Sequence, residues 1–194
     1  MIGVGGLARS GKDTLSNCLK KVIEKDLNCK VEIVHLADKL KSDLDKLIAC
    51  NFNFQVFTEE NEEKELIRPI LVAYGEAMKK KWGQTIWIDK LSKEIKLRKE
   101  KKFFIISDVR FDFECKYIRE QFDGWNIHIK KNGNEMAVNE IEKENDPLVE
   151  NEADIKHIWP AYHPDKMHLC EDHATIMWEM IPIEYKNKWR KTLN

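Results

Sequence analysis

The residues with the clearest chemical potential lie near the start of the chain, in the stretch GGLARSGKDT at positions 5 to 14. Gly6 and Gly11 have the G-x-x-x-x-G-K spacing, with Lys12 directly after the second glycine. Glycine permits a tight turn that points successive main-chain N–H groups inward, and a helix that begins there adds partial positive charge. This arrangement suits an anionic ligand. We therefore expect a polyphosphate to be bound by Gly6, Ala8, Arg9, Ser10, Gly11, Lys12, Asp13 and Thr14.

Asp13 departs from the strict pattern, in which Ser or Thr follows the lysine. A carboxylate oxygen is also a good ligand for Mg²⁺, directly or through water, and Thr14 supplies a hydroxyl group one position later. The alternative is a glycine-rich turn between a strand and a helix, with Lys12 on the surface. The apolar run before the stretch and the helical spacing of apolar residues after it favour the phosphate-binding interpretation.

A second set of candidate residues follows the apolar run FFIIS at positions 103 to 107. Such a run predicts a buried strand, and Asp108 stands at its carboxyl end, where open α/β sheets bind their ligands. We expect Asp108 to join Asp13 in organising Mg²⁺. Arg110 carries a planar guanidinium group that matches a phosphate. The structural alternatives are a helix-capping aspartate and an arginine in a salt bridge.

Composition narrows the classes of partner. Basic and acidic residues nearly cancel, 33 against 34, which argues against nucleic acid or a membrane surface as the main partner. The five cysteines are scattered and form no C-x-x-C pair, as is typical of reduced thiols. No apolar run is long enough to cross a bilayer or to act as a signal peptide. We expect a cytoplasmic protein with small-molecule partners, and a homodimer stays open.

Strands and helices alternate over the first 130 residues. Apolar runs predict strands at 1–5, 31–37, 103–107 and 125–130, and residues at helical spacing predict helices between them. One of these helices starts near Ile67 with Pro69 in its first turn. This order predicts an α/β fold of three layers with a parallel sheet.

Periodicity fades from residue 131 to about 172, where Asn, Glu, Asp, Pro and His dominate. We expect this segment to be an irregular, lid-like insertion. A closing helix that carries Ile181, Tyr185 and Trp189 follows it. The chain is then a single domain over 1–194, with its core in 1–130 and 173–194.

The loop ARSGKDT resembles the phosphate loop of bacteriophage-type deoxynucleoside monophosphate kinases, and it is similar to the G-K-D loop of animal phosphomevalonate kinases. Three later blocks resemble the same phage-type family: HLADKLKSDL at 35–44, the stretch from IRPIL to WIDKL at 67–91, and FFIISDVRFDFECKYI at 103–118. Together they cover residues 1 to about 130. The resemblance implies a P-loop NTPase fold, ATP and Mg²⁺, and transfer of the γ-phosphate of ATP to a deoxynucleoside monophosphate in the cytoplasm, that of the host if the protein is viral.

The resemblance also implies roles for individual residues. Lys12, Asp13, Asp108 and Arg110 become the catalytic residues. Since the acceptor phosphate is already an anionic nucleophile, the reaction needs charge neutralisation and alignment more than a general base. Substrate contacts are expected from Asp38, Lys41, Arg68, Tyr74, Gly75, Glu76, Trp87 and Arg110.

Several of these residues also have a purely structural interpretation. Asp38 can be a helix cap with Lys41 in solvent, and Arg68 can be an exposed helix residue. The aromatic residues proposed as a wall against a nucleobase can equally be core: Phe52, Phe54, Phe57, Tyr74, Trp82 and Trp87.

Two further questions stay open at this stage. His163, His168, Cys170 and His173 have metal-ligand types, but their H-x4-H-x-C-x2-H spacing fits no zinc module, and solvated histidines are the favoured interpretation. The segment between Arg119 and Arg190 lacks arginine, so that Lys130 or Lys131 would have to replace the arginines of the family's lid. The alternative functions are a phosphomevalonate kinase and a nucleotide-binding regulatory module without turnover.

Overall fold

The structure, a computed structural model, describes residues 1–52, 55–98, 100–133, 136–137, 139–160, 166 and 168–193, with only the backbone described at 46, 47, 51 and 52. The chain divides into two compact units. Residues 1–34 and 99–194 form the first unit, and residues 35–98 form the second.

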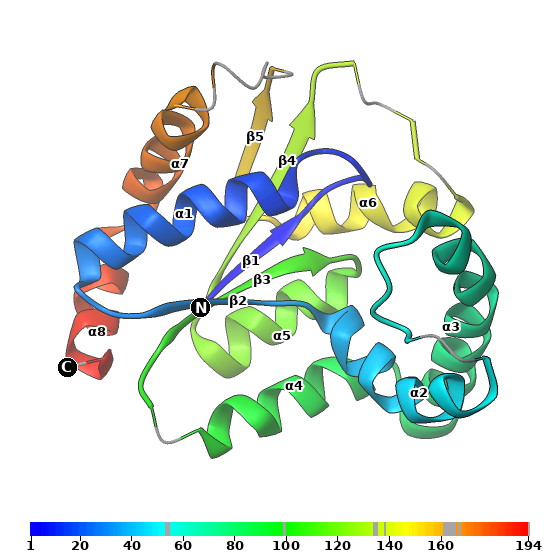
Figure 1. Cartoon of the computed structure of the whole chain (residues 1–194). Helices are drawn as coiled ribbons and strands as arrows, with labels where there is room; N and C mark the ends of the chain where they lie inside the picture. Colours follow the sequence, from blue (N-terminus) through cyan, green and yellow to red (C-terminus); the bar gives the residue numbers. More distant parts are fainter. Residues whose placement is uncertain are drawn as a thin grey trace. The chain divides into compact units, whose positions relative to one another are not determined.

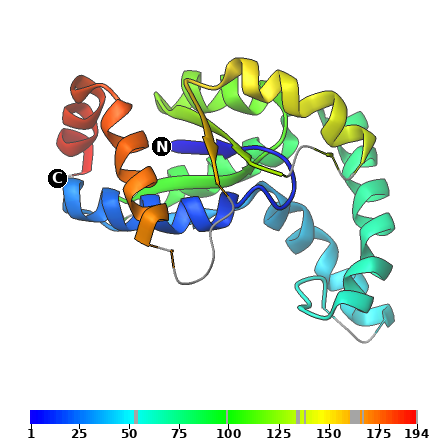
Figure 2. The same ribbon diagram turned by 90° about the horizontal axis from the view of Figure 1, so that it is seen from above.

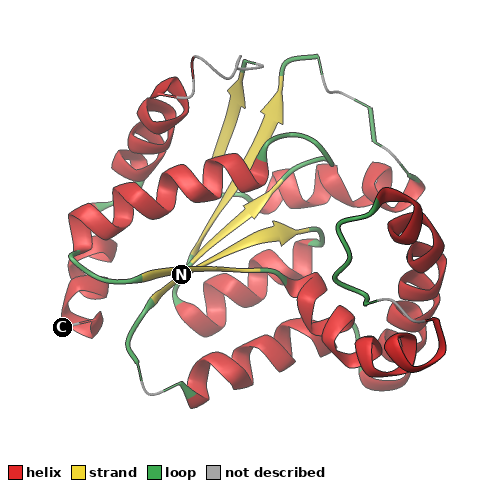
Figure 3. Ribbon diagram, viewed as in Figure 1, coloured by secondary structure: helices red, strands yellow, loops and turns green. Residues whose placement is uncertain are grey.

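The first unit contains a five-stranded sheet in the order β2-β3-β1-β4-β5, in which every neighbouring pair is parallel (Figure 3). The strands are β1 (Ile2–Gly5), β2 (Val31–Val34), β3 (Phe103–Val109), β4 (Trp125–Lys131) and β5 (Ile155–Trp159). The predicted α/β fold with a parallel sheet is therefore confirmed. Because all strands run the same way, their carboxyl ends meet at one edge, where such sheets bind ligands.

The described residues of the first unit include the helices α1 (Lys12–Leu27), α5 (Asp112–Phe122), α6 (Glu140–Glu152), α7 (His168–Met180) and α8 (Ile183–Leu193). Helices α1 and α6 lie on opposite faces of the sheet (Figures 1 and 2). The main core joins buried residues of α1, α7 and α8 to one face of the strands. The helices and the sheet thus form the three layers that the sequence predicts.

The two faces of strand β1 pack against different parts of the first unit. Ile2 and Val4 are fully buried in the core that contains α1. Gly5 alternates to the other face, where a Cβ atom would lie 2.6 Å from Cγ1 of Val149 in α6. Glycine at this position therefore allows α6 to pack tightly against the end of β1.

The second unit is helical. It consists of α2 (Leu36–Phe52), α3 (Asn61–Trp82) and α4 (Ile86–Leu97). A small core of Leu44, Ile48, Val56 and Ile67 holds α2 and α3 together.

Two predicted boundaries in this part of the chain were wrong. The strand predicted at 31–37 ends at Val34, because a turn follows in which the N–H of Asp38 donates to the carbonyl of His35. Helix α3 begins at Asn61, so Pro69 lies inside it and not in its first turn. The polar residues before Ile67 include Glu and Lys, which are strong helix formers and extend the helix towards its N-terminus.

The structure also differs from the prediction between residues 131 and 172. The expected irregular segment contains α6 and β5, and β5 is paired with β4 as a regular strand of the sheet. Helix α6 has few apolar residues and a proline, Pro147, which weakened the helical pattern. The single closing helix is in fact two, α7 and α8, and Ile181 is buried at the junction between them.

Two further features concern the environment of the protein. None of the helices in the described ranges is both long and apolar enough to span a bilayer. All five cysteines are free thiols, and Cys115 and Cys170 are fully buried. Disulfides therefore make no contribution to the stability of the described parts.

Candidate functional site

The loop between β1 and α1 has the backbone geometry of an anion-binding turn. Gly6, Arg9 and Gly11 have positive φ angles of 136°, 62° and 89°. Helix α1 begins at Lys12, and the N–H of Leu15 closes its first turn on the carbonyl of Gly11 at 2.9 Å. The loop thus leads into the positive end of a long helix at the ligand edge of the sheet.

Lys12 lies within this loop. Its Nζ donates to the carbonyl oxygens of Gly6 and Leu7, both at 2.8 Å. The pKa of Lys12 is lowered, first by burial and then by the charge of Arg110. Three carboxylates oppose this lowering of its pKa, and they belong to Glu142, Asp13 and Asp108. The charges of the three other predicted catalytic residues, and that of Glu142, therefore act on the ammonium group of Lys12.

Trp159, at the end of β5, supports the loop from behind. Its indole Nε1 donates to the carbonyl of Ser10 at 2.8 Å, and the side chain is buried. A Cβ atom on Gly11 would lie 2.5 Å from Cζ2 of the same ring. Gly11 is therefore fixed both by its positive φ and by the tryptophan ring behind it.

Two polar groups of the loop bear on whether a phosphate fits there. The Oγ atom of Ser10 is buried and has no hydrogen-bond partner among the described residues. The N–H of Ala8 donates to Oε2 of Glu142 at 3.4 Å, so this amide already faces an anion. The buried hydroxyl group without a partner and the amide that faces a negative charge are both compatible with an anion at this loop.

Mg²⁺ needs only one or two carboxylates beside phosphate oxygens and water. Asp13 is exposed in the first turn of α1, with Thr14 half-buried beside it, and Asp108 stands near the end of β3. The charges of both carboxylates act on Lys12. This donor set fits Mg²⁺ with few protein ligands.

Arg110 follows β3 and is exposed. The carboxyl group of Glu114 accepts hydrogen bonds from the main-chain N–H of Arg110 at 2.7 Å and of Phe111 at 3.1 Å. Burial raises the pKa of Glu114 to about 8, and the nearby charge of Asp108 adds to this effect. Glu114 thus fixes the backbone that carries Arg110.

The other predicted substrate residues, Asp38, Lys41, Arg68, Tyr74, Gly75, Glu76 and Trp87, belong to the second unit. Arg68 and Glu76 are exposed and pair within α3, with Glu65 and Lys79 respectively, at 3.2 Å each. Gly75 is buried, and a Cβ atom there would lie 2.8 Å from Cδ1 of Leu40. Its small size therefore also serves the packing of α2 against α3.

The aromatic residues of the second unit differ in exposure, since Phe57 and Trp82 are exposed and Trp87 is buried. The rings of Tyr74 and Trp87 lie 6.2 Å apart, and Trp87 is 6% exposed. Lys41 places its Nζ 5.5 Å from the ring centroid of Phe57. Phe54 and the side chain of Phe52 lie outside the described residues. Asp38 stands in the first turn of α2.

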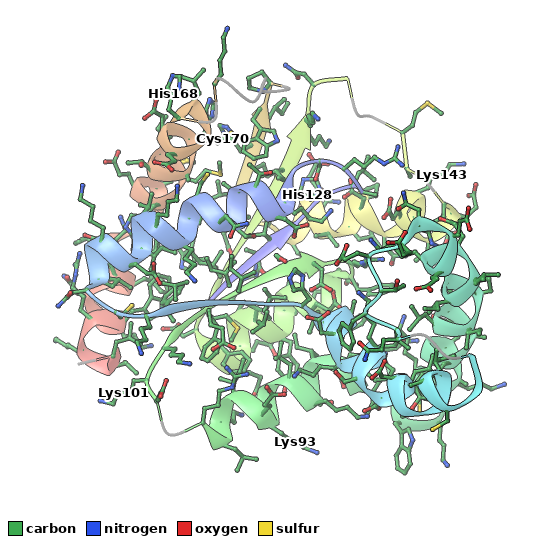
Figure 4. The ribbon with its side chains drawn as sticks, viewed as in Figure 1. Lys93, Lys101, His128, Lys143, His168 and Cys170 are labelled. Atoms are coloured by element: carbon green, nitrogen blue, oxygen red, sulfur yellow. The ribbon has the colours of Figure 1, made fainter. Side chains whose placement is uncertain are left out.

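The histidine and cysteine cluster is not assembled in the described part of the chain, and His163 lies outside that part. His168 and Cys170 are at the start of α7 (Figure 4), but Cys170 is fully buried in the core. His173 instead contacts His157 of β5, with Nδ1 and Nε2 at 2.7 Å. No group of three metal-ligating side chains occurs among the described residues.

Sequence reasoning missed three residues of this region: Glu114, Glu142 and Trp159. A local pattern marks Glu114, because it is an acidic residue three positions after Phe111, the N-cap residue of α5. The other two reach the loop from 134 and 149 positions away along the chain, and no local pattern marks them.

The sequence model of the phosphomevalonate kinase family matches residues 4–124, which contain every predicted site residue but end before α6. None of the curated proteins matches. A solved structure, the dephospho-CoA kinase from Campylobacter jejuni, is 14% identical with a TM-score of 0.48, covering 92% of this chain and 96% of that chain.

Trp159→Phe should loosen the loop without emptying the core. The variant keeps an aromatic ring but leaves the buried carbonyl of Ser10 without its donor, so we expect a loss of about 1–2 kcal/mol in the free energy of unfolding. Chemical denaturation measures it. Trp189→Phe is the matched control, because the Nε1 of this buried tryptophan has no partner among the described residues. Equal losses in the two variants would contradict the role of the Trp159 hydrogen bond.

Glu114→Gln should change how stability depends on pH. The pKa of Glu114 is raised from 4.5 to about 8 in the folded state, so the wild type loses stability from this group as the pH rises between these values. Glutamine still accepts the two hydrogen bonds and does not ionise. Relative to the wild type, the variant should gain up to a few kcal/mol between pH 5 and pH 8. Parallel curves of unfolding free energy against pH would disprove this.

Proposed function

We propose that this P-loop kinase, which belongs to the phosphomevalonate kinase family, transfers the γ-phosphate of ATP to a deoxynucleoside monophosphate. One observation supports the proposal: the loop after the first strand has the backbone angles of an anion-binding turn, and the charges of Asp13, Asp108 and Arg110 act on Lys12 within it. A lysine, an arginine and two carboxylates in one place provide what phosphoryl transfer between two anions requires, namely neutralisation and alignment of charge.

The loop between β1 and α1 is proposed to bind the phosphate donor, ATP. Lys12 now holds the carbonyls of Gly6 and Leu7, and a β- or γ-phosphate would take over its ammonium group. Main-chain N–H groups between residues 8 and 13 would bind the remaining phosphate oxygens, apart from that of Ser10, which donates to the carbonyl of Leu7. Asp13 and Asp108 would hold Mg²⁺, which when bound offsets the negative charge shared by donor and acceptor.

On the acceptor side, Arg110 is proposed to bind the acceptor phosphate through its guanidinium group. Its backbone is held by Glu114, so the side chain starts from a fixed point. The nucleophile is an oxygen of that phosphate, already anionic, and no side chain has to remove a proton from it. The other predicted substrate residues remain the proposed source of further acceptor contacts: Asp38, Lys41, Arg68, Tyr74, Gly75, Glu76 and Trp87.

The choice of a nucleotide acceptor is supported by the four sequence blocks that resemble the phage-type kinases and by the paired rings of Tyr74 and Trp87. Since Trp87 is almost fully buried, Tyr74 is the better candidate to contact a base. The near balance of charge on the chain supports small molecules as its partners in a cytoplasmic setting.

Phosphomevalonate is the second candidate acceptor, and the family match over residues 4–124 is the observation that favours it. That acceptor carries a carboxylate and no ring, so its recognition would depend on cationic side chains and not on Tyr74. A third candidate is a nucleotide-binding module without turnover.

Lys12→Ala should abolish most of the activity. Without the ammonium group, the charge that develops on the transferring phosphoryl group is poorly offset, and kcat/KM should fall by about 100-fold or more. A coupled assay for ADP formation with ATP, Mg²⁺ and each deoxynucleoside monophosphate measures this. Lys25→Ala is the control, because Lys25 is exposed in the last turn of the same helix, about 20 Å from the loop.

The same assay, run over the four deoxynucleoside monophosphates and phosphomevalonate, separates the candidate functions. Turnover of a nucleotide supports the proposal, and turnover of phosphomevalonate alone replaces it with the second candidate. Binding of ATP with no product from any of these acceptors would overturn the proposal of a deoxynucleoside monophosphate kinase.

A further inference from the structure

Helix α6 presents a row of three acidic side chains to the sheet and the loop. Glu142, Asp146 and Glu150 are spaced four residues apart, so they share one face of the helix. Asp146 Oδ1 lies 2.9 Å from Nε2 of His128, and Glu150 Oε2 lies 2.7 Å from Nζ of Lys130. Figure 4 shows His128 on β4 and Lys143 on α6. Two members of the row thus attach the helix to β4.

These contacts, together with two others, hold α6 and therefore the backbone of Glu142 in place. His128 is almost fully buried, and Val149 packs against Gly5 at the end of β1. The N-terminal end is also ordered, because Asn139 caps the helix by accepting the N–H of Glu142 at 2.8 Å. The backbone at Glu142 is therefore held in place by contacts on both sides of it.

Glu142 itself reaches the loop. Its Oε2 accepts the N–H of Ala8 at 3.4 Å, which is a long hydrogen bond, and its charge acts on Lys12. Beside it lies a cavity of about 500 Å³ whose lining includes Leu7, Lys131 and Lys143. A carboxylate thus stands at the mouth of a loop that is built for anions, where it meets any phosphate that enters.

We infer that Glu142 is a specificity-determining residue that favours the magnesium complex of the donor over the metal-free polyphosphate. The inference rests on the proposed function, because it takes the loop to be the ATP site. Repulsion grows with the charge of the ligand, and metal-free ATP carries about twice the negative charge of its magnesium complex at neutral pH. The carboxylate therefore weakens binding of the metal-free form more than binding of the complex.

The test compares the affinities of Glu142→Gln and wild-type protein for ATP. Titration calorimetry is run with ATP in excess EDTA and with ATP in excess Mg²⁺, and inorganic triphosphate serves as a probe without a base. Glutamine has the same shape and still accepts the N–H of Ala8. In the variant, the Kd for metal-free ATP should fall about 10-fold and that for the magnesium complex about threefold. The ratio of the two Kd values should therefore shrink by about threefold.

Glu144→Gln is the matched control, because Glu144 is exposed on the same helix and its loss changes the net charge equally. It should change either Kd by less than about twofold. A Glu142→Gln variant that binds the magnesium complex more weakly would make Glu142 a metal ligand and overturn the inference. An unchanged ratio, or the same change in both variants, would also overturn it.

Folding and function are checked in the same series. Thermal melting shows whether Glu142→Gln keeps the fold, and Glu142→Ala, which should shift the Kd ratio in the same direction, provides a second reading. If wild-type protein binds neither ATP nor triphosphate, the proposed function fails and this inference fails with it. If wild-type protein binds both and Lys12→Ala binds neither, an unchanged ratio for Glu142→Gln overturns this inference alone.

Discussion

The candidate site depends on one constraint: the chain must turn from β1 into α1 with its N–H groups facing inward. Gly6, Arg9 and Gly11 have the positive φ angles that such a turn requires. The turn is also held from outside, since Trp159 bonds to the carbonyl of Ser10 and its ring lies against Gly11. The shape of the loop is therefore built in before any phosphate arrives, which lowers the cost of ordering it on binding.

Close packing at the end of β1 also determines which charged side chains lie near the loop. Gly5 lets α6 approach, and α6 then carries Glu142 to the N–H of Ala8. The other neighbouring strand, β3, carries Asp108 and is followed by Arg110. The charges of one cation and three carboxylates therefore act on Lys12. A balance of this kind suits a site in which anions have to arrive, react and leave, because a purely cationic basin would hold its products.

The sequence was sufficient for the parts of the site that are local. The spacing of Gly6, Gly11 and Lys12, and the apolar run before Asp108, are patterns within a few residues. They predicted the turn into α1 and the presence of β3, although β3 continues to Val109, so that Asp108 lies inside the strand and is buried. Glu142 and Trp159 could not be predicted in this way, because their contacts depend on how β5 and α6 pack on the sheet. Helix α6 was missed for a related reason: its acidic face is paired with His128 and Lys130, so it lacks the apolar stripe that marks a buried helix.

The central claim is that residues 6 to 14 bind a polyphosphate through their main-chain N–H groups. Amide chemical shifts of the ¹⁵N-labelled full chain, recorded as ATP and Mg²⁺ are added, test this claim most directly. The account predicts that the largest shifts occur at residues 8 to 13, with Gly11 and Lys12 foremost, since these N–H groups would donate to phosphate oxygens. Saturable binding that leaves these amides unmoved and shifts others would contradict it.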